Sequence, residues 1–336
     1  MVTPQAKPIE IGGTTVLPGK RERVELPVAR LSTQTMLSLP VIVVHGKREG
    51  PKLWLSAAIH GDEINGVEII RQILTQIKPH QLCGSLLAVP IVNIFGFIEQ
   101  SRYLPDRRDL NRSFPGSSHG SLAARLANLF MREIANRCTH GIDLHTAAEH
   151  RSNLPHLRAN LKDEETYRCA SAFAAPLMIH ARTRGGSLRH AASKRGIPTL
   201  LYEAGEALRF NTEAIHIGVA GIMRVMNYLN MYKEPEAVSD NSSLEIMTTK
   251  WVRASRSGLL HLEVNLGDRI EKKQSLGFIT DAFGEKKVKI RASVAGIVIS
   301  QVQNPLVNQG DGIVHIAILT TPEISTSCLK SDVSIQ

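Results

Sequence analysis

The chain has few aromatic residues, few cysteines and no long apolar segment. Phenylalanine, tryptophan and tyrosine make up only 4% of its 336 residues, and no zinc-finger or helix-turn-helix pattern appears, so nucleic-acid binding is disfavoured. The four cysteines lie far apart without paired spacing, which argues against a disulfide scaffold and a thiolate zinc site. The N-terminus lacks the apolar segment of a signal peptide, and no run approaches the ~20 apolar residues that span a bilayer. We therefore expect a cytoplasmic protein without a membrane partner.

Apolar runs of strand length alternate with segments of helical periodicity through the first two thirds of the chain. The strand-like runs cover residues 53–59, 86–92, 141–145, 176–180 and 198–202. The segments with helical spacing cover residues 62–77, 121–137, 163–174 and 212–229. This alternation, preceded by short strands at 22–45, is typical of an α/β layered domain, which we place at residues 1–235.

A polar linker at residues 232–243 separates this domain from a segment that contains short strands only. The predicted strands cover residues 250–254, 258–262, 275–280, 287–292, 296–302 and 312–319. We expect an all-β domain at 245–325 that resembles a biotinyl/lipoyl-type sandwich. Lys286 and Lys287 do not lie in the Ala-Met-Lys-Met or Asp-Lys-Ala setting of a carrier lysine, so a structural role that narrows access to the site is favoured.

The segment His60-Gly61-Asp62-Glu63 lies where a buried strand ends and a helical pattern begins. At such a corner two side chains three residues apart can converge on one point. Position 64 is isoleucine, so the metalloprotease pattern with a second histidine four residues on is absent, and the corner supplies only two ligands. A histidine and a glutamate at this spacing also occur by chance, and the further segments decide the interpretation.

Asp143 and His145 lie two apart on a predicted strand and so face the same side. His145 is the best candidate for a third ligand, and Asp143 could orient its imidazole by accepting the other ring N–H. Two imidazoles and one carboxylate form a three-ligand zinc site with a position left for water. Glu203, at the end of another apolar run, is placed where α/β enzymes carry chemistry and could shuttle protons, with Glu206 as its nearest competitor.

Residues 101–116 hold four arginines interrupted by proline, aspartate and asparagine, which indicates a loop. Arginine forks bind carboxylates and developing oxyanions, and Asn111 beside Arg112 adds a neutral donor and acceptor. A solvated basic loop is the alternative. Arg158 and the arginines of 182–189 could add contacts to a substrate, although a solvated loop explains them at least as well. We interpret His150 and His156 as loop residues that line or flank the cleft.

Together these segments resemble the succinylglutamate desuccinylase/aspartoacylase family, within the zinc carboxypeptidase-like superfamily. The matching stretches are 39–46, His60 to Glu63 with Asn65-Gly66, Arg102, 109–116, Asp143 to His145, and Glu203. The resemblance implies a mixed sheet flanked by helices and one zinc ion per chain, held by His60, Glu63 and His145.

The resemblance also implies roles for other residues. Glu203 would take a proton from the zinc-bound water and deliver it to the leaving nitrogen. Arg102 would polarise the scissile carbonyl and hold the oxyanion, and Asn111 with Arg112 would clamp a carboxylate or other polar group. One departure concerns substrate binding: aspartoacylase-like enzymes use a tyrosine of the C-terminal domain, yet every tyrosine here precedes that domain. Asn304, Asn308 and Asp311 are candidates for its replacement.

The net charge of +9, with many arginines around the predicted cleft, favours a small anionic substrate over nucleic acid. We expect a zinc-dependent amidohydrolase that removes the acyl group from an N-acyl amino acid or a related small amine. A metallocarboxypeptidase uses the same ligands and is the alternative among enzymes. A non-catalytic metal-binding protein is the alternative of another class, although metal binding alone needs neither Arg102 nor Glu203. The acyl group, the amine and the presence of a homo-oligomer stay open.

Overall fold

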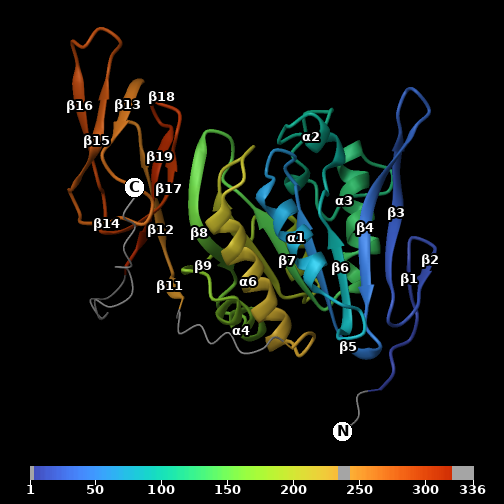
Figure 1. The fold of residues 1–336 in the computed structure, drawn as a ribbon. Coiled ribbons are helices and arrows are strands. Elements are labelled where there is room, and N and C mark those ends of the chain that lie inside the picture. Colours follow the sequence, from blue (N-terminus) through green and yellow to red (C-terminus); the bar gives the residue numbers. More distant parts are fainter. Residues whose placement is uncertain (1–3, 234–242, 320–336) are drawn as a thin grey trace.

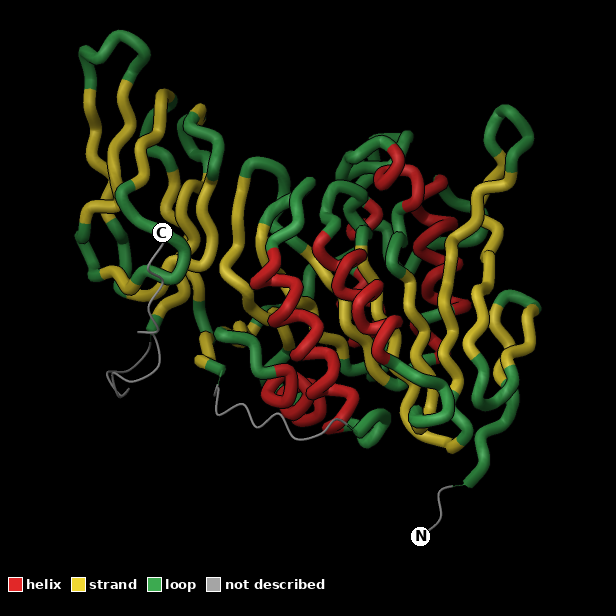
Figure 2. The backbone as a smooth tube through the Cα atoms, in the orientation of Figure 1, coloured by secondary structure: helices red, strands yellow, loops and turns green. Residues whose placement is uncertain are grey.

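A continuous mixed sheet of thirteen strands runs through the computed structural model, which describes residues 4–233 and 243–319. Helices cover both of its faces (Figures 1 and 2). Its central strands β10, β7, β5 and β6 are parallel, and β4 and β3 extend one edge in antiparallel order. These strands are β3 (Arg21–Arg30), β4 (Met36–His45), β5 (Arg48–Ala57), β6 (Cys83–Val89), β7 (His140–His145) and β10 (Thr199–Gly205). The predicted α/β fold with helix-flanked mixed sheet is confirmed.

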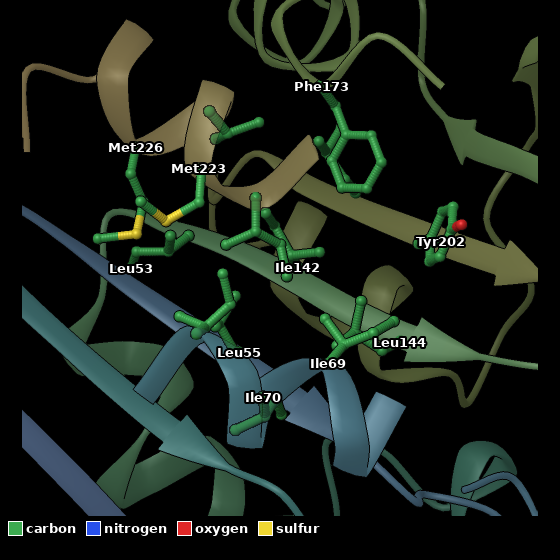
Figure 3. Packing of buried hydrophobic residues seen from close by; sticks show 14 of the residues in the cluster. Leu53, Leu55, Ile69, Ile70, Ile142, Leu144, Phe173, Tyr202, Met223 and Met226 are labelled. Atoms are coloured by element: carbon green, nitrogen blue, oxygen red, sulfur yellow. The ribbon is translucent and has the colours of Figure 1, made fainter. Parts of the chain in front are cut away.

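Alternating side chains along the central strands divide the core between the two faces of the sheet. Leu53 and Leu55 of β5 point to one face and pack with Ile69 and Met223, as Figure 3 shows, whereas the intervening Trp54 packs on the other face. This division follows from the two-residue period of a strand. Because both faces are buried, the strand reads in the sequence as an uninterrupted apolar run.

Three helices cover each face. The first face carries α1 (Asn65–Gln76), α4 (Glu164–Phe173) and α6 (Thr212–Tyr228), and the other carries α2 (Ile94–Ile98), α3 (Leu122–Glu133) and α5 (Leu188–Ser193). Ser121, Asp163 and Asn211 cap α3, α4 and α6, since each side chain accepts a hydrogen bond from an N–H of the first turn. Helix α1 begins three residues later than the predicted start at 62, so Glu63 lies in the turn before it. Short 3-10 turns occur at η1 (Leu110–Arg112) and η2 (Ala135–Arg137).

The C-terminal strands continue the central sheet. Strand β8 (Arg151–Ala159) pairs with β10 on one side and with β17 (Gly296–Val302) on the other, and β19 (Gly312–Ile318) and β12 (Thr249–Arg253) follow. The remaining strands of this sheet are β9 (Leu177–His180), β11 (Leu244–Ile246) and β14 (Arg269–Ile270). The separate two-stranded sheet of β1 (Ile9–Ile11) and β2 (Thr14–Val16) lies near the N-terminus.

A separate antiparallel sheet completes the C-terminal segment, which is all-β as expected. It contains β16 (Lys287–Arg291), β15 (Ser275–Thr280), β13 (Gly258–Leu262) and β18 (Leu306–Val307). These strands share an apolar core with β12, β17 and β19, among them Leu276, Ile279, Val298 and Val314. The division into domains at 1–235 and 245–325, and the likeness to a biotinyl/lipoyl-type sandwich, stay predictions. The predicted linker falls mostly at 234–242, and residues 320–325 of the predicted β domain likewise lie outside the described residues.

Two features of the described chain bear on the sequence-based expectations. Strand β8 was not predicted, and His156, expected in a loop, lies within it and is buried. None of the helices in the described ranges has both the length and the apolar character that crossing a membrane requires.

Candidate metal centre and active site

The three predicted metal ligands meet at the carboxyl ends of two neighbouring parallel strands. Ala57 of β5 lies opposite Leu144 of β7, so the chain leaving β5 brings His60 beside His145 at the end of β7. Glu63 follows in a tight turn, in which the backbone N–H of Glu63 donates a hydrogen bond of 3.1 Å to the His60 carbonyl. The open crevice at this edge of a parallel sheet is where α/β proteins bind ligands.

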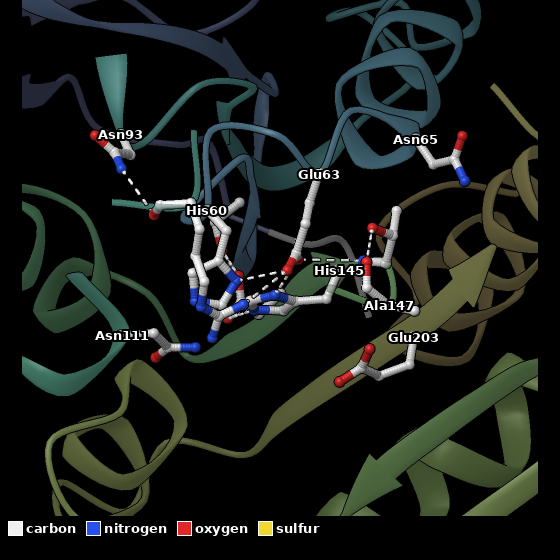
Figure 4. Close-up of polar contacts among 12 residues, drawn as sticks. His60, Glu63, Asn65, Asn93, Asn111, His145, Ala147 and Glu203 are labelled. Carbon is white, nitrogen blue, oxygen red and sulfur yellow. Dashed lines mark hydrogen bonds and ion pairs between the residues drawn. The ribbon is translucent and has the colours of Figure 1, made fainter. Parts of the chain in front are cut away.

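The Glu63 carboxylate lies between the two imidazoles, as Figure 4 shows. Its Oε1 is 2.7 Å from Nδ1 of His60, and its Oε2 is 2.7 Å from Nδ1 of His145. All three side chains are buried, and one donor atom from each lies within 4.8 Å of the other two. Each residue therefore turns a potential ligand atom to one point.

The outer nitrogen of each imidazole contacts a second carboxylate. Nε2 of His145 is 2.9 Å from Oδ2 of Asp143, and Nε2 of His60 is 3.2 Å from Oδ1 of Asp109. The other oxygen of Asp143 accepts a hydrogen bond of 2.8 Å from the Ser56 hydroxyl. A histidine whose outer N–H is held by a carboxylate presents the inner nitrogen as a ligand, which is the usual support of a zinc-binding histidine. This donor set fits zinc.

The local charges favour an ionised Glu63. Burial by itself raises the pKa of this carboxyl, but the imidazoles of His60 and His145 lower that pKa well below its ordinary value. For His145, burial lowers the imidazole pKa and the carboxylates of Asp143 and Glu63 outweigh it, so that the pKa is raised. The group is thus an arrangement of opposite charges held out of water.

Arg102 connects the corner to the arginine-rich loop. Its guanidinium donates to Oε1 of Glu63 at 3.3 Å and to Oδ2 of Asp109 at 3.1 Å. The predicted loop is confirmed in this region, apart from the short turn η1 that carries Asn111 and Arg112. Arg102 therefore places a positive charge at the edge of the ligand cluster, where it can face an oxyanion.

Asn111 and Arg112 line the same cavity as Arg102. The Oδ1 atom of Asn111 accepts from the backbone N–H of Leu188 at 3.0 Å, which ties η1 to α5. The amide of Asn111 points toward the histidines in Figure 4. A guanidinium of Arg112 donates to the Asn111 carbonyl at 2.6 Å. Both side chains lie where they could contact a bound molecule.

Glu203 lies on β10 directly opposite His145 of β7. Its Oε2 accepts a hydrogen bond of 2.9 Å from the side-chain amide of Asn153, and burial raises its pKa. It lines the cavity with the three ligands, whereas Glu206 pairs with Arg209 at 2.9 Å and is absent from the cavity wall. The geometry thus puts Glu203, and not its competitor, beside the cluster.

The cavity that contains these residues has a volume of about 300 Å³ and is walled partly by C-terminal strands. Trp251, Ser300 and His315 contribute from β12, β17 and β19. Their order follows the sheet register, because Asn153 lies opposite Ser300, Ser300 opposite His315, and His315 opposite Trp251. The C-terminal segment therefore narrows the site by extending its sheet. Asn304, Asn308 and Asp311, named as replacements for the missing tyrosine, do not line this cavity.

The sequence did not identify Asn153, Trp251 and His315 as residues of the cavity wall. It left open whether Arg158 and the arginines of 182–189 contact a substrate. The arginine content was the available signal. The other three depend on pairing between strands that are distant in the sequence, such as Asn153 with Ser300 and Trp251 with His315, for which no local pattern exists.

Comparisons with known proteins agree with the motifs. A model described as the succinylglutamate desuccinylase/aspartoacylase catalytic domain matches residues 49–229, more than half of the chain. The chain is 26% identical over 308 residues to N-alpha-acetyl-L-2,4-diaminobutyric acid deacetylase of Halomonas elongata, covering 88% of this chain and 90% of that protein.

Solved structures share the fold. A succinylglutamate desuccinylase/aspartoacylase from Rhodobacter sphaeroides superposes with a TM-score of 0.81 at 24% identity, covering 90% of this chain and 96% of that one. The product-bound ectoine utilization protein EutE (DoeB) from Ruegeria pomeroyi also gives a TM-score of 0.81, at 23% identity, with 89% and 95% coverage. These similarities span both the α/β part and the C-terminal strands.

Proposed function

The chain belongs to the succinylglutamate desuccinylase/aspartoacylase family, and on this premise we propose that it is a zinc-dependent deacylase that hydrolyses the amide bond of a small N-acylated amino acid or amine. The observation that carries the proposal is the convergence of His60, Glu63 and His145 with Arg102 and Glu203 on one cavity. A zinc ion held by the three ligands supplies Lewis acidity, which lowers the pKa of water and polarises a carbonyl.

Glu203 is the proposed proton carrier. A carboxylate beside the ligand cluster can take a proton from the attacking water and return it to the leaving nitrogen, since amide hydrolysis needs both a base and an acid. Burial raises the pKa of Glu203, which makes the carboxyl a better proton acceptor than an exposed glutamate. The Asn153 amide, 2.9 Å from Oε2, fixes the direction of the carboxylate.

The two loop arginines have different proposed tasks. Arg102 adjoins Glu63 and so lies next to the place where charge develops on the scissile carbonyl oxygen. Arg112 is exposed at the mouth of the cavity, beside the buried Asn111, and the two can hold a carboxylate by charge-assisted hydrogen bonds. Asp143 positions His145 and contacts no substrate in this proposal.

The size of the cavity supports a small substrate over a peptide terminus. At about 300 Å³, with strands β12, β17 and β19 forming one wall, it matches a compact N-acyl amino acid. A metallocarboxypeptidase would need an open groove for the peptide that precedes the cleaved residue. The deacetylase from Halomonas elongata, by its name, acts on a compound of the compact class.

The proposal is tested by amine release from a panel of N-acyl amino acids with zinc-loaded full-length protein. The panel includes N-acetyl, N-succinyl and longer acyl groups, N-alpha-acetyl-L-2,4-diaminobutyric acid, and short peptides for the carboxypeptidase alternative. Glu203→Gln is the matched variant, because it keeps the shape of the side chain and removes the base. Its kcat should fall by about 10²–10⁴-fold, with zinc content unchanged by elemental analysis.

Two outcomes would contradict the proposal at different points. If Glu203→Gln were as fast as the parent on every cleaved substrate, the assignment of the base would be wrong. If zinc-loaded protein released amine from no amide, the non-catalytic alternative would replace the enzyme.

A further inference from the structure

The cavity contains far more positive charge than hydrolysis of one amide requires. Seven arginines line it, whereas Glu63 and Glu203 are its only acidic wall residues within the described chain. The seven are Arg102, Arg112, Arg151, Arg158, Arg182, Arg184 and Arg189. Arg102 is ion-paired with Glu63 and Asp109, and no other member of the set forms an ion pair with a carboxylate of residues 4–233 or 243–319. Six cationic side chains therefore form no ion pair within the described residues. Carboxylates act on three of them from a longer distance, namely Asp109 on Arg112, Asp143 and Glu203 on Arg189, and Glu203 on Arg158.

These arginines occupy two regions. Arg112, Arg182 and Arg184 are exposed at the mouth. Arg151 and Arg158 are half-buried and lie on strand β8, and the buried Arg189 of α5 is near enough to Arg158 for their charges to interact. Both terminal nitrogens of Arg189 donate to backbone carbonyls, those of Ala181 and Arg182, at 2.9 Å and 3.1 Å. Arg189 therefore stabilises the loop that begins at residue 181.

Arg158 forms no ion pair among the described residues, although the carboxylate of Glu203 attracts its charge across the cavity wall. Its Nε approaches Nε2 of His156 at 3.4 Å, and no other hydrogen bond of its guanidinium occurs among the described residues. Burial, and then the charge of Arg158, lower the pKa of His156 to about 3, and the same two causes with Arg151 lower the pKa of His315 to about 3. Both imidazoles are therefore neutral at physiological pH. The two terminal nitrogens of Arg158 are therefore available to donate hydrogen bonds to a ligand.

Arg151 lies on the same strand as Arg158, seven residues earlier, and is held by an aromatic stack. Its guanidinium carbon lies 5.1 Å from the centre of the Trp251 ring, and that ring is parallel to His315 at 4.4 Å. A guanidinium held over an aromatic face keeps its charge and loses little further freedom when it binds an anion. The C-terminal strands thereby fix a second cation on the wall.

We propose that Arg158, with Arg151 as a further cation on the wall of the same cavity, forms a second anion-binding subsite, which takes a carboxylate of the substrate remote from the scissile amide. The ligand identity rests on the proposed amide hydrolysis, but the subsite itself is a binding property. Strand β8 lies about 4.8 Å from β10, which carries Glu203, so a guanidinium on β8 reaches a group a few bonds away from an amide beside Glu203. A substrate ammonium bound at this subsite would be repelled by the guanidiniums.

The subsite is tested by calorimetric binding to zinc-loaded full-length Glu203→Gln protein, in which slow turnover does not obscure affinity. Two matched pairs of ligands each differ by one negative charge. N-acetyl-L-glutamate against N-acetyl-L-glutamine changes the amine half, and N-succinyl-L-alanine against N-butanoyl-L-alanine changes the acyl half. We expect the extra carboxylate to tighten binding by about 10- to 100-fold in at least one pair, as for a charge-assisted hydrogen bond. N-alpha-acetyl-L-lysine, whose side chain is positively charged, should bind most weakly of all the ligands.

The added substitution Arg158→Gln should bring the affinity ratio of that pair close to one, and Arg158→Lys should retain part of it. Lys272→Gln, an exposed position remote from the cavity wall, removes the same charge and should leave the ratio intact. If Arg158→Gln does not fold, Arg151→Gln takes its place. Equal affinities within both pairs, or a preference that survives the loss of the arginine, would overturn the subsite. Absence of hydrolysis in the separate amine-release assay would instead overturn only the proposed function.

Discussion

His145 is held by Asp143 of the same strand, with 2.9 Å between Nε2 of the imidazole and Oδ2 of the carboxylate. The contact leaves Nδ1 of His145 facing Glu63, 2.7 Å away. Because the second oxygen of Asp143 is occupied by the Ser56 hydroxyl at 2.8 Å, the carboxylate cannot turn away. A buried chain of three residues therefore sets the direction of one proposed ligand.

Asp143→Asn tests this chain. Asparagine keeps the size of the side chain, but it is uncharged and has only one oxygen to accept hydrogen bonds from His145 and Ser56. We therefore expect zinc affinity to fall by about 10- to 100-fold. The dissociation constant is measured by competition with a fluorescent chelator. Ser56→Ala, which removes only the outer hydrogen bond, should weaken zinc by less. Equal affinities of parent and Asp143→Asn would show that Asp143 does not support the metal site.

Arg102 and Arg112 are expected to fail in different ways when each is replaced by alanine. Arg102 adjoins Glu63 and in the proposed role would act on charge that develops in the transition state, so its loss should mainly lower kcat, by about 10²–10³-fold. In the proposed role, Arg112 would bind ground state and transition state alike, so its loss should mainly raise KM. Steady-state kinetics on the best substrate separate the two cases. Proportional changes of kcat and KM in both variants would argue against this division.

The convergence of the proposed ligands could be predicted because the two histidines lie at the ends of apolar runs that the sequence marks clearly. His60 follows the run at 53–59 and His145 ends the run at 141–145, and the two runs form neighbouring parallel strands of the mixed sheet, whose carboxyl ends meet. The predicted helix boundaries were less accurate, as for α1, where Asp62 and Glu63 belong to the preceding turn.

Strand β8 could not be predicted from the same signals. Its sequence, Arg-Ser-Asn-Leu-Pro-His-Leu-Arg-Ala, is polar because the strand lines the cavity, and Pro155 argues against a central strand. The structure accommodates Pro155 where β8 changes its partner: residues 151–153 pair with β17, and residues 156–159 pair with β9. The cationic wall was thus concealed in a segment that reads as a loop.

Gly61 determines how closely the ligand corner packs against the following segment. A Cβ at this position would lie 1.9 Å from the carbonyl carbon of Gly96 and 2.2 Å from the nitrogen of Phe97, both backbone atoms. Gly61→Ala should therefore cost about 1–3 kcal/mol of unfolding free energy, as overpacking does, and displace His60 enough to weaken zinc binding.

Urea unfolding followed by circular dichroism measures this cost. Gly185→Ala is the matched control, because a Cβ there meets no atom within 4 Å, and its unfolding free energy should stay within about 0.5 kcal/mol of the parent. A Gly61→Ala protein with parental stability and zinc affinity would show that the corner tolerates displacement.

His156 links folding to acid. Its Nδ1 donates to the Leu154 carbonyl at 2.7 Å, and burial with the nearby Arg158 lowers its pKa from 6.5 to about 3. At a pH between these two pKa values, His156 is protonated in the unfolded chain and neutral in the folded chain. Stability contributed by the neutral imidazole is therefore full above pH 6.5 and declines as the pH falls toward 3, by about 1.4 kcal/mol per pH unit for one proton.

His156→Asn removes this proton and keeps an N–H donor near the position of Nδ1. Unfolding free energies from urea titrations at pH 7, 6, 5 and 4 should therefore fall less steeply for the variant, by about 1.4 kcal/mol per pH unit in the window below 6.5. The metal ligands are common to both proteins, so the difference between the two slopes isolates position 156. His119→Asn, at an exposed loop position, is the matched control. Parallel curves for the parent and His156→Asn would mean that the buried imidazole takes up its proton in the folded protein as readily as in the unfolded chain.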